Sequence, residues 1–455
     1  MKRFITTLEN IWKIKELRER ILFTIGILAV YRLASYVTLP GVDPALVEAA
    51  TSANDGDSQT LFDFINLFTG GAFELASVMA LGIMPYITAS IIVQLLGFAV
   101  PYFQRLQQKE GESGRKKIGQ ITRLLTLAIT LVQGAGYLTY VKTSGYIAAG
   151  FPEAVFWVSG IIILSAGTIF AMWLGEKITD RGIGNGISLL ITVGIVASLP
   201  GALLGELNIK AEEGSLITFV LELFAFFAIV MVTVAIVQAV RKIPIQFAKR
   251  SVGRGAAALP MAGARDYIPL KVNAAGVMPI IFAQALMFLP ATIGGTLASG
   301  GNPPEWVLAL SNPFSLASSI LAFLLVVIFT YVYTALLVNP TQYAEYLKRQ
   351  NAFIPGIKPG KPTADFIDAV TTRITLPGSI FLGLIAILPA FAYMAGVNQS
   401  FALFFGGTSL LIIVAVILDT LDQVESHLLM RRYDGLVKDG RIQGRSRMQG
   451  IGAPM

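Results

Sequence analysis

The chain reads GIMPYI at residues 82–87 and GVMPII at residues 276–281, and this pair of related stretches gives the strongest indication of its fold. A second pair follows in the same order, with GISLLI at residues 186–191 and GTSLLI at residues 407–412. Short apolar matches arise by chance, but two pairs in one order indicate that the chain contains an internal duplication.

The composition predicts a membrane protein. Of the 455 residues, 54% are hydrophobic and only 14% are charged, and the mean hydropathy is +0.67, which is too apolar for a soluble chain of this length. A transmembrane helix needs about 20 mostly apolar residues. The apolar runs predict ten spans, at residues 21–38, 74–98, 119–141, 154–174, 185–203, 216–240, 273–294, 316–338, 376–395 and 400–419.

The distribution of Lys and Arg predicts the orientation, because cytoplasmic loops carry the excess of basic residues. No basic residue lies between Arg32 and Arg105, so the loop after the first span is expected outside. The loops after the second, fourth, sixth and eighth spans and the C-terminal tail are basic, which places both termini in the cytoplasm. No small-residue cleavage site follows the first apolar run, so this span is expected to remain.

The matched stretches lie in spans two and seven and in spans five and ten, so both pairs are five spans apart. A repeat with an odd number of spans must place its second copy upside down, which predicts two inverted halves related by an axis in the membrane plane. Such an axis would bring Ile87, Ile191, Ile281 and Ile412 together near the midplane as a narrow apolar collar. The alternative for each isoleucine is ordinary packing against lipid or a neighbouring helix.

A short amphipathic segment, TLFDFINLF at residues 60–68, precedes the second span and ends at Thr69, Gly70 and Gly71. It is too short to cross a bilayer. The two glycines suggest a hinge, because glycine tolerates backbone angles that other residues avoid. The segment is predicted either to lie on the membrane surface or to fold back into the bundle as a movable stopper.

Two long basic loops are predicted in the cytoplasm, at residues 241–272 and 339–375. They fit the general excess of positive charge on that side. They also fit a docking surface for a ribosome, whose RNA is a dense polyanion, or for another large cytosolic partner.

The sequence offers no enzyme chemistry and no predicted cofactor. The stretch GIKPGKP at residues 356–362 has the wrong spacing for a nucleotide-binding loop, and the chain has no cysteine for a disulfide or a thiolate metal site. The central parts of the spans carry almost no ionisable residue, although Arg32 lies in span one and is expected to snorkel to an interface. Two functions therefore remain, a passive protein channel and a carrier of small apolar solutes, and the basic loops favour the channel.

Over nearly its whole length the chain resembles the SecY family, the large pore-forming subunits of the bacterial Sec translocon. The resemblance rests on KEGESGRKK at 109–117, WLGE at 173–176, RGIGNGIS at 181–188, PLKVN at 269–273, PGIKPG at 355–360 and FGGTSLL at 405–411. It implies an all-α fold in which ten transmembrane helices form a clamshell of two inverted five-helix repeats. It also implies a passive channel that translocates unfolded secretory proteins across the cytoplasmic membrane and releases membrane proteins laterally.

The resemblance assigns roles to individual positions. The isoleucine ring of the pore would consist of Ile83, Ile87, Ile187, Ile191, Ile281 and Ile412. The plug would include Leu61, Phe62, Phe64, Ile65, Phe68, Gly70 and Gly71. A lateral gate, formed by spans two and three against seven and eight, would carry Thr88, Gln94 and Asn185. Cytoplasmic docking would involve Lys249, Arg250, Arg254, Lys358 and Lys361.

The implied partners are the small membrane subunits SecE and SecG, the motor ATPase SecA, the ribosome, signal sequences, unfolded precursors and membrane lipid. Lys358 stands where the family usually has arginine, and lysine keeps the charge but lacks the planar guanidinium group.

The implied division of the chain is a cytoplasmic amphipathic segment (1–20), the first half (21–203) with its plug (60–73), an external loop with span six (204–240), a docking loop (241–272), spans seven and eight (273–338), a second docking loop (339–375), spans nine and ten (376–423) and a basic tail (424–455).

Overall fold

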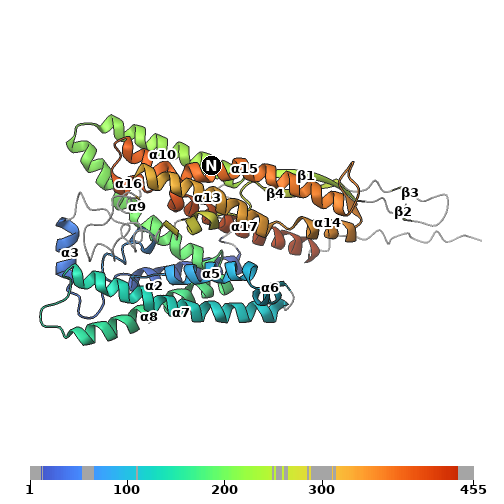
Figure 1. Ribbon diagram of the computed structural model, residues 1–455. Helices are drawn as coiled ribbons and strands as arrows, with labels where there is room; N and C mark the ends of the chain where they lie inside the picture. The colour runs from blue at the N-terminus through green and yellow to red at the C-terminus, as the bar shows by residue number, and fades with distance from the viewer. Residues whose placement is uncertain are drawn as a thin grey trace, which may run out of the picture.

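The computed structural model is a bundle of long helices with a small sheet at one end (Figure 1). It describes residues 12, 14–53, 66–108, 111–247, 251–252, 259–260, 265–283, 286–287, 310 and 314–438. The helices of the first half are α2 (Lys15–Ala34), α3 (Pro44–Ala53), α5 (Met84–Ala99), α6 (Pro101–Gln108), α7 (Gly111–Thr143), α8 (Glu153–Arg181) and α9 (Gly186–Glu212). Those of the second half are α10 (Leu216–Val237), α13 (Leu316–Leu337), α14 (Pro340–Arg349), α15 (Lys361–Met394), α16 (Gln399–Ala402) and α17 (Gly407–Lys438).

Each of the ten predicted spans contains helix. Within the described ranges, seven helices are long and apolar enough to cross a membrane, and a shorter apolar helix covers Met84–Gly97. Helix α2 and the helical residues 278–283 occupy the predicted first and seventh spans. The helical membrane fold expected from the sequence is therefore confirmed.

The repeated stretches adopt repeated local structure. Gly82 and Gly276 both have left-handed backbone angles, with φ of 51° and 65°, and in both copies helix begins two residues later. Each of these helices carries proline in its first turn, where the missing N–H leaves no helical hydrogen bond unmade. Likewise, Gly186 is the first residue of α9 and Gly407 the first residue of α17. The duplication read from the sequence is a duplication of these helix starts.

The two halves lie side by side, and α9 runs between them (Figure 1). Helices α2, α5, α7 and α8 lie on one side of α9, whereas α10, α13, α15 and α17 lie on the other. Helix α9 packs against α8 and α2 of its own half and against α17, α10 and α16 of the second half. Where α9 begins, the Gly184 N–H donates to Gln423 Oε1 over 2.9 Å, which ties the α8–α9 turn to α17.

Several predicted boundaries are wrong. Helix α5 begins at Met84 rather than at residue 74, because residues 70–83 form a series of turns. Helix α9 continues to Glu212, so residues 204–212 are helical and not part of an external loop. Hydropathy missed this continuation because Glu206, Lys210 and Glu212 lower the apolar average beyond the span.

The two long loops are folded and meet in one sheet. Strand β1 (Val240–Phe247) pairs antiparallel with β4 (Arg265–Lys271) and with β5 (Ala352–Phe353), while β2 (Ser251–Val252) pairs with β3 (Leu259–Pro260). The three-stranded sheet has its own apolar core, in which Ile243 and Leu270 pack with Leu347 and Ile367. Much of the second predicted loop is also helical, since α14 and the start of α15 lie within it.

The contact between α7 and the turns before α5 provides a test of this packing. The buried Tyr137 hydroxyl donates to the Phe73 carbonyl over 2.6 Å, and the two rings are 4.7 Å apart. We expect Tyr137→Phe to lower the free energy of unfolding by about 0.5–1.5 kcal/mol, because the Phe73 carbonyl loses one of its two donors and keeps the Ala76 N–H at 3.3 Å. Denaturant unfolding of the purified protein in detergent measures the change. The exposed Tyr102→Phe is the control, and equal losses in both variants would contradict the assignment.

Candidate functional site

An apolar constriction lies where the two halves meet. Ile83, Ile191 and Ile412 are buried in one hydrophobic cluster, and Ile87 and Ile187 pack against it. Ile281 belongs to a neighbouring cluster that Ile87 also contacts. The structure therefore brings the six predicted isoleucines into two adjoining clusters.

The helix starts position these isoleucines. Ile83 immediately precedes α5, Ile187 and Ile191 lie in the first two turns of α9, and Ile412 lies in the second turn of α17. Helices α8 and α9 approach closely at Gly186, where a Cβ atom would collide with the Gly175 carbonyl oxygen. Close approach of backbones at glycine is a common packing solution for membrane helices.

Residues 66–83 enter the bundle and reach the constriction. Leu67 and Phe68 are buried in the same cluster as Ile83 and Ile191. The backbone lies directly on α9, because a Cβ atom at Gly194 would be 2.5 Å from the Phe68 carbonyl oxygen. Of the two sequence alternatives for this segment, its described part takes the buried one. The plug positions Leu61, Phe62, Phe64 and Ile65 lie outside the described residues.

Two hydrogen bonds join Asn66 to Glu74 and so connect the two ends of the turn at Gly70 and Gly71. The Asn66 amide donates to Glu74 Oε2 over 2.6 Å, and the Glu74 backbone N–H donates to Asn66 Oδ1 over 3.1 Å. Gly70 and Gly71, which the sequence suggested as a hinge, have φ of 65° and 90°. These angles favour glycine, so both positions are needed for the turn.

Arg32 on α2 holds this turn, a role that the sequence did not predict. Its Nη1 donates to the Gly70 carbonyl over 2.5 Å, and its guanidinium lies 5.3 Å from the centre of the Tyr36 ring. Arg32 therefore binds the backbone of the buried segment, and the expectation that it snorkels to an interface stays a prediction. No sequence signal links the two residues, because the interaction spans 38 positions and ends on a carbonyl.

A seam between the halves is formed by the second, seventh and eighth spans. Ile91 on α5 packs with Phe282 in the seventh span and with Tyr333 on α13. The Tyr333 hydroxyl also donates to Gln94 Oε1 across the seam. Gln94 thus lies where the resemblance predicted a gate, and Tyr333 and Phe282 are additional seam residues that sequence reasoning missed.

The other two predicted gate residues bond locally. Thr88 Oγ1 donates to the Met84 carbonyl of its own helix over 3.1 Å. Asn185 caps α9, because its Oδ1 accepts from the N–H groups of Ile187 and Ser188 over 3.2 and 3.4 Å. Neither contact crosses the seam, and capping by Asn follows from its preference for the position before a helix.

The predicted docking residues are only partly described. Lys249, Arg250 and Arg254 lie outside the described residues. Lys358 and Lys361 are exposed beside the sheet, Lys358 in the turn that precedes α15 and Lys361 at the first residue of that helix. The Thr363 hydroxyl donates to the Lys358 carbonyl over 2.9 Å, which ties this turn to the first turn of the helix.

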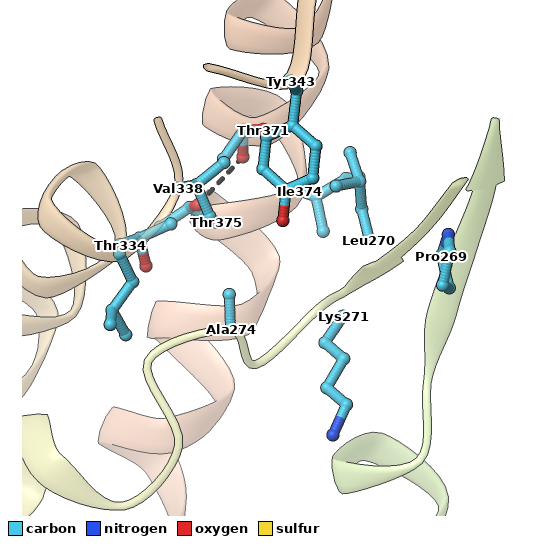
Figure 2. Close-up of a pocket in the computed structure, with 11 residues that line it drawn as sticks. Pro269, Leu270, Lys271, Ala274, Thr334, Val338, Tyr343, Thr371, Ile374 and Thr375 are labelled. Carbon is cyan, nitrogen blue, oxygen red and sulfur yellow. Dashed lines mark hydrogen bonds between the residues drawn. The ribbon is translucent and has the colours of Figure 1, made fainter. Parts of the chain in front are cut away.

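A pocket of about 290 Å³ opens between β4, α13, α14 and α15 (Figure 2). Its lining mixes apolar and hydroxyl side chains, and Lys271 is its charged member. One of its hydroxyl groups already makes a hydrogen bond within its own helix, since Thr375 Oγ1 donates to the Thr371 carbonyl over 2.8 Å. The pocket holds no acid–base pair, and the part of the chain that the structure describes contains no group of three or more His, Cys, Asp or Glu residues that could hold a metal ion.

Comparison with known proteins identifies the family. A family model described as SecY matches residues 77–421. The chain belongs to the SecY family. A protein translocase subunit SecY from Streptomyces coelicolor is 43% identical over 444 residues, covering 95% of this chain and 100% of that relative. One from Chlamydia trachomatis serovar D is 39% identical over 460 residues, covering 97% and 100%.

Solved structures share the fold of this SecY-family chain. One described as "The structure of a protein conducting channel" has a TM-score of 0.62 at 20% identity, covering 90% of this chain and 91% of that chain. The Sec61 channel in a canine ribosome-channel complex has a TM-score of 0.59 at 18% identity, with the same coverage. The clamshell expected from the resemblance is therefore confirmed as the fold.

The contact of Arg32 with Gly70 generates a prediction. We expect Arg32→Met to loosen residues 66–83, because the Gly70 carbonyl loses a charged donor. A cysteine placed at the buried Phe68 reports this opening, and its labelling by a maleimide should become several-fold faster in the Arg32→Met background. Arg20→Met, on the same helix but paired with Glu16, should leave the labelling rate unchanged. Equal rates in all three backgrounds would show that Arg32 does not hold the segment.

The seam generates a second prediction. Tyr333→Phe removes the hydroxyl that bonds Gln94, so we expect α5 and α13 to separate more often. Spin labels on cysteines at the partly exposed Ile92 and Val332 should report a distance distribution that shifts to longer values. Tyr331→Phe, two residues away on the same helix, is the matched control. An unchanged distribution in Tyr333→Phe would exclude this hydrogen bond as a restraint on the seam.

Proposed function

We propose that the chain is the pore-forming subunit of a channel that translocates unfolded secretory proteins across the cytoplasmic membrane and releases membrane proteins laterally into it. The observation that carries this proposal is the apolar constriction formed by both halves and reached by residues 66–83. The chain acts without enzymatic chemistry, and a motor ATPase, a ribosome or the membrane potential supplies the energy.

The isoleucines suit a seal that must also let a polypeptide pass. An apolar constriction holds back water and ions by dewetting. It has no fixed charge that would bind a passing segment, whatever its sequence. Residues 66–73 act as the plug beneath this ring, and Gly70 and Gly71 allow the plug to swing away when the Arg32 contact breaks.

The seam between α5 and α13 suits a lateral gate. It is held by a small apolar cluster and by the hydrogen bond between Tyr333 and Gln94. Polar contacts between membrane helices are typically worth about 1 kcal/mol or less. An apolar signal sequence that replaces the aromatic contacts of Phe282 and Tyr333 can therefore open the seam at little energetic cost.

A carrier of small apolar solutes fits the structure less well. Ion-coupled carriers place ionisable groups near the middle of the membrane. Among the described residues, the charged side chains of Glu206, Lys210 and Glu222 are at most 12% exposed, and they lie where α9 meets α10 and not at the constriction.

The channel is proposed to work in the bacterial inner membrane with both termini in the cytoplasm. The sheet and the exposed Lys358 and Lys361 would then form a cytoplasmic surface for the ribosome and for SecA. The ribosome-bound canine channel of the same fold supports this assignment. Helix α10 leaves an apolar face open, where Ile217 is 87% exposed, and this face is available to lipid or to a small subunit such as SecE or SecG.

A crosslinking experiment tests the proposal directly, because the chain has no cysteine of its own. One cysteine is placed at Ile87 or Ile191, another in a secretory precursor stalled in transit, and disulfide formation is measured in membrane vesicles. We expect both pore positions to crosslink and Val132→Cys, at a site 75% exposed on α7, to remain unlinked. If neither pore position contacts the precursor in active vesicles, the channel assignment fails and the carrier must be reconsidered.

A further inference from the structure

Three carboxylates surround a single ammonium group where α9 meets α10. Lys210 Nζ lies 3.8 Å from Glu206 Oε1, 3.6 Å from Glu213 Oε2 and 3.7 Å from Glu222 Oε1. Glu206 and Lys210 belong to α9, Glu213 directly follows it, and Glu222 lies in the second turn of α10. The cluster therefore joins the last helix of the first half to the first helix of the second half.

The cluster also holds the turn between α15 and α16. Lys210 Nζ donates to the Gly396 carbonyl over 2.9 Å, and the Asn398 backbone N–H donates to Glu206 Oε2 over 2.9 Å. Lys210 is thus a donor to the second half while it neutralises acidic groups from both halves. The charged groups facing the site from α9, α10 and this turn are Lys210, Glu206, Glu213 and Glu222.

The buried part of the cluster has one negative charge too many. The side chains of Glu206, Lys210 and Glu222 are only 0%, 10% and 12% exposed, whereas Glu213 is 57% exposed and is screened by solvent. Two buried carboxylates thus share one buried ammonium. Glu206 Oε1 and Glu222 Oε2 are moreover buried without a hydrogen-bond partner. A buried, unpaired charge is strongly destabilising, so an additional positive species belongs here.

We propose that the junction of α9 and α10 is a proton-binding site, in which one proton neutralises the excess negative charge at Glu222. Glu206 and Glu222 face the same ammonium group, at 3.8 and 3.7 Å from Lys210 Nζ. The proton turns one carboxylate into a donor and leaves the other as an acceptor, and it reduces the buried charge to zero. Lys210 already supplies the fixed cation, so a small neutralising species is sufficient.

Proton binding stabilises the contact between the halves. Below the pH at which the bound proton dissociates, the buried cluster is neutral. Above that pH, the second carboxylate becomes charged and repels the first. The junction is therefore expected to weaken as the pH rises and to strengthen as it falls. The site stands on its own contacts; only its position on the outer side of the membrane rests on the proposed function.

The matched variants are Glu222→Gln and Glu213→Gln, both of which remove one carboxylate near Lys210. Thermal unfolding of the full chain in detergent is followed from mildly acidic to mildly alkaline pH. The wild type should lose Tm as the pH rises, and Glu222→Gln should lose most of that dependence because glutamine stays neutral. Glu213→Gln should keep the wild-type slope, since Glu213 is largely solvated.

Infrared spectroscopy provides a readout that does not depend on stability. At neutral pH the wild type and Glu213→Gln should show the carbonyl stretch of a buried protonated carboxyl group, and Glu222→Gln should lack it. Glu206→Gln gives a second variant, because glutamine can still accept from the Asn398 N–H. A wild type without this band, or the same pH slope in wild type and both buried variants, overturns the proposal. If added sodium ions, and not a lower pH, stabilise the protein, the occupant is a metal cation and the proton-binding proposal is overturned. Neither outcome changes the crosslinking expected at Ile87, which tests the proposed channel function separately.

Discussion

The rest of the structure depends on the burial of non-helical backbone inside a helical bundle. Between residues 70 and 83 the chain forms turns, and such backbone is tolerated at membrane depth only where protein or water satisfies its polar groups. The surrounding helices supply these partners. Arg32 donates to the Gly70 carbonyl, Tyr137 donates to the Phe73 carbonyl, and the Val78 N–H donates to the Val37 carbonyl over 2.8 Å. The first half is therefore built around the segment that reaches the constriction.

The two sides of the bundle are held together by interactions of different strength. At the junction of α9 with α10, charged groups bond across the halves in a buried setting, as between Lys210 and the Gly396 carbonyl. At the seam of α5 with α13, a neutral hydrogen bond from Tyr333 to Gln94 accompanies a small apolar cluster. Hydrogen bonds to charged groups are about twice as strong as neutral ones. In the proposed channel, this difference would let the seam between α5 and α13 open while the junction of α9 with α10 stays closed.

Residues with strong local preferences bond locally even where the resemblance assigns them another role. Asn185 lies directly before α9 and caps that helix, and its assignment to the gate stays a prediction. The basic loops, which the sequence predicts as cytoplasmic docking surfaces, also contain a strand, because alternating isoleucines at Ile243 and Ile245 place β1 on an apolar core. That alternation was present in the sequence, and the period of two that marks a strand was the signal overlooked.

The sequence by itself determined the membrane class, the approximate places of the ten spans, the internal duplication and four isoleucines of the constriction, because hydropathy and repeated motifs are local properties of the chain. Only the tertiary structure decided which polar groups pair inside the bundle. Gln94 and Tyr333 are 239 positions apart, Glu206 and Asn398 are 192 positions apart, and Arg32 binds a backbone carbonyl. Such partners leave no local pattern, since the requirement to satisfy a buried charge or carbonyl does not specify which distant residue will do so.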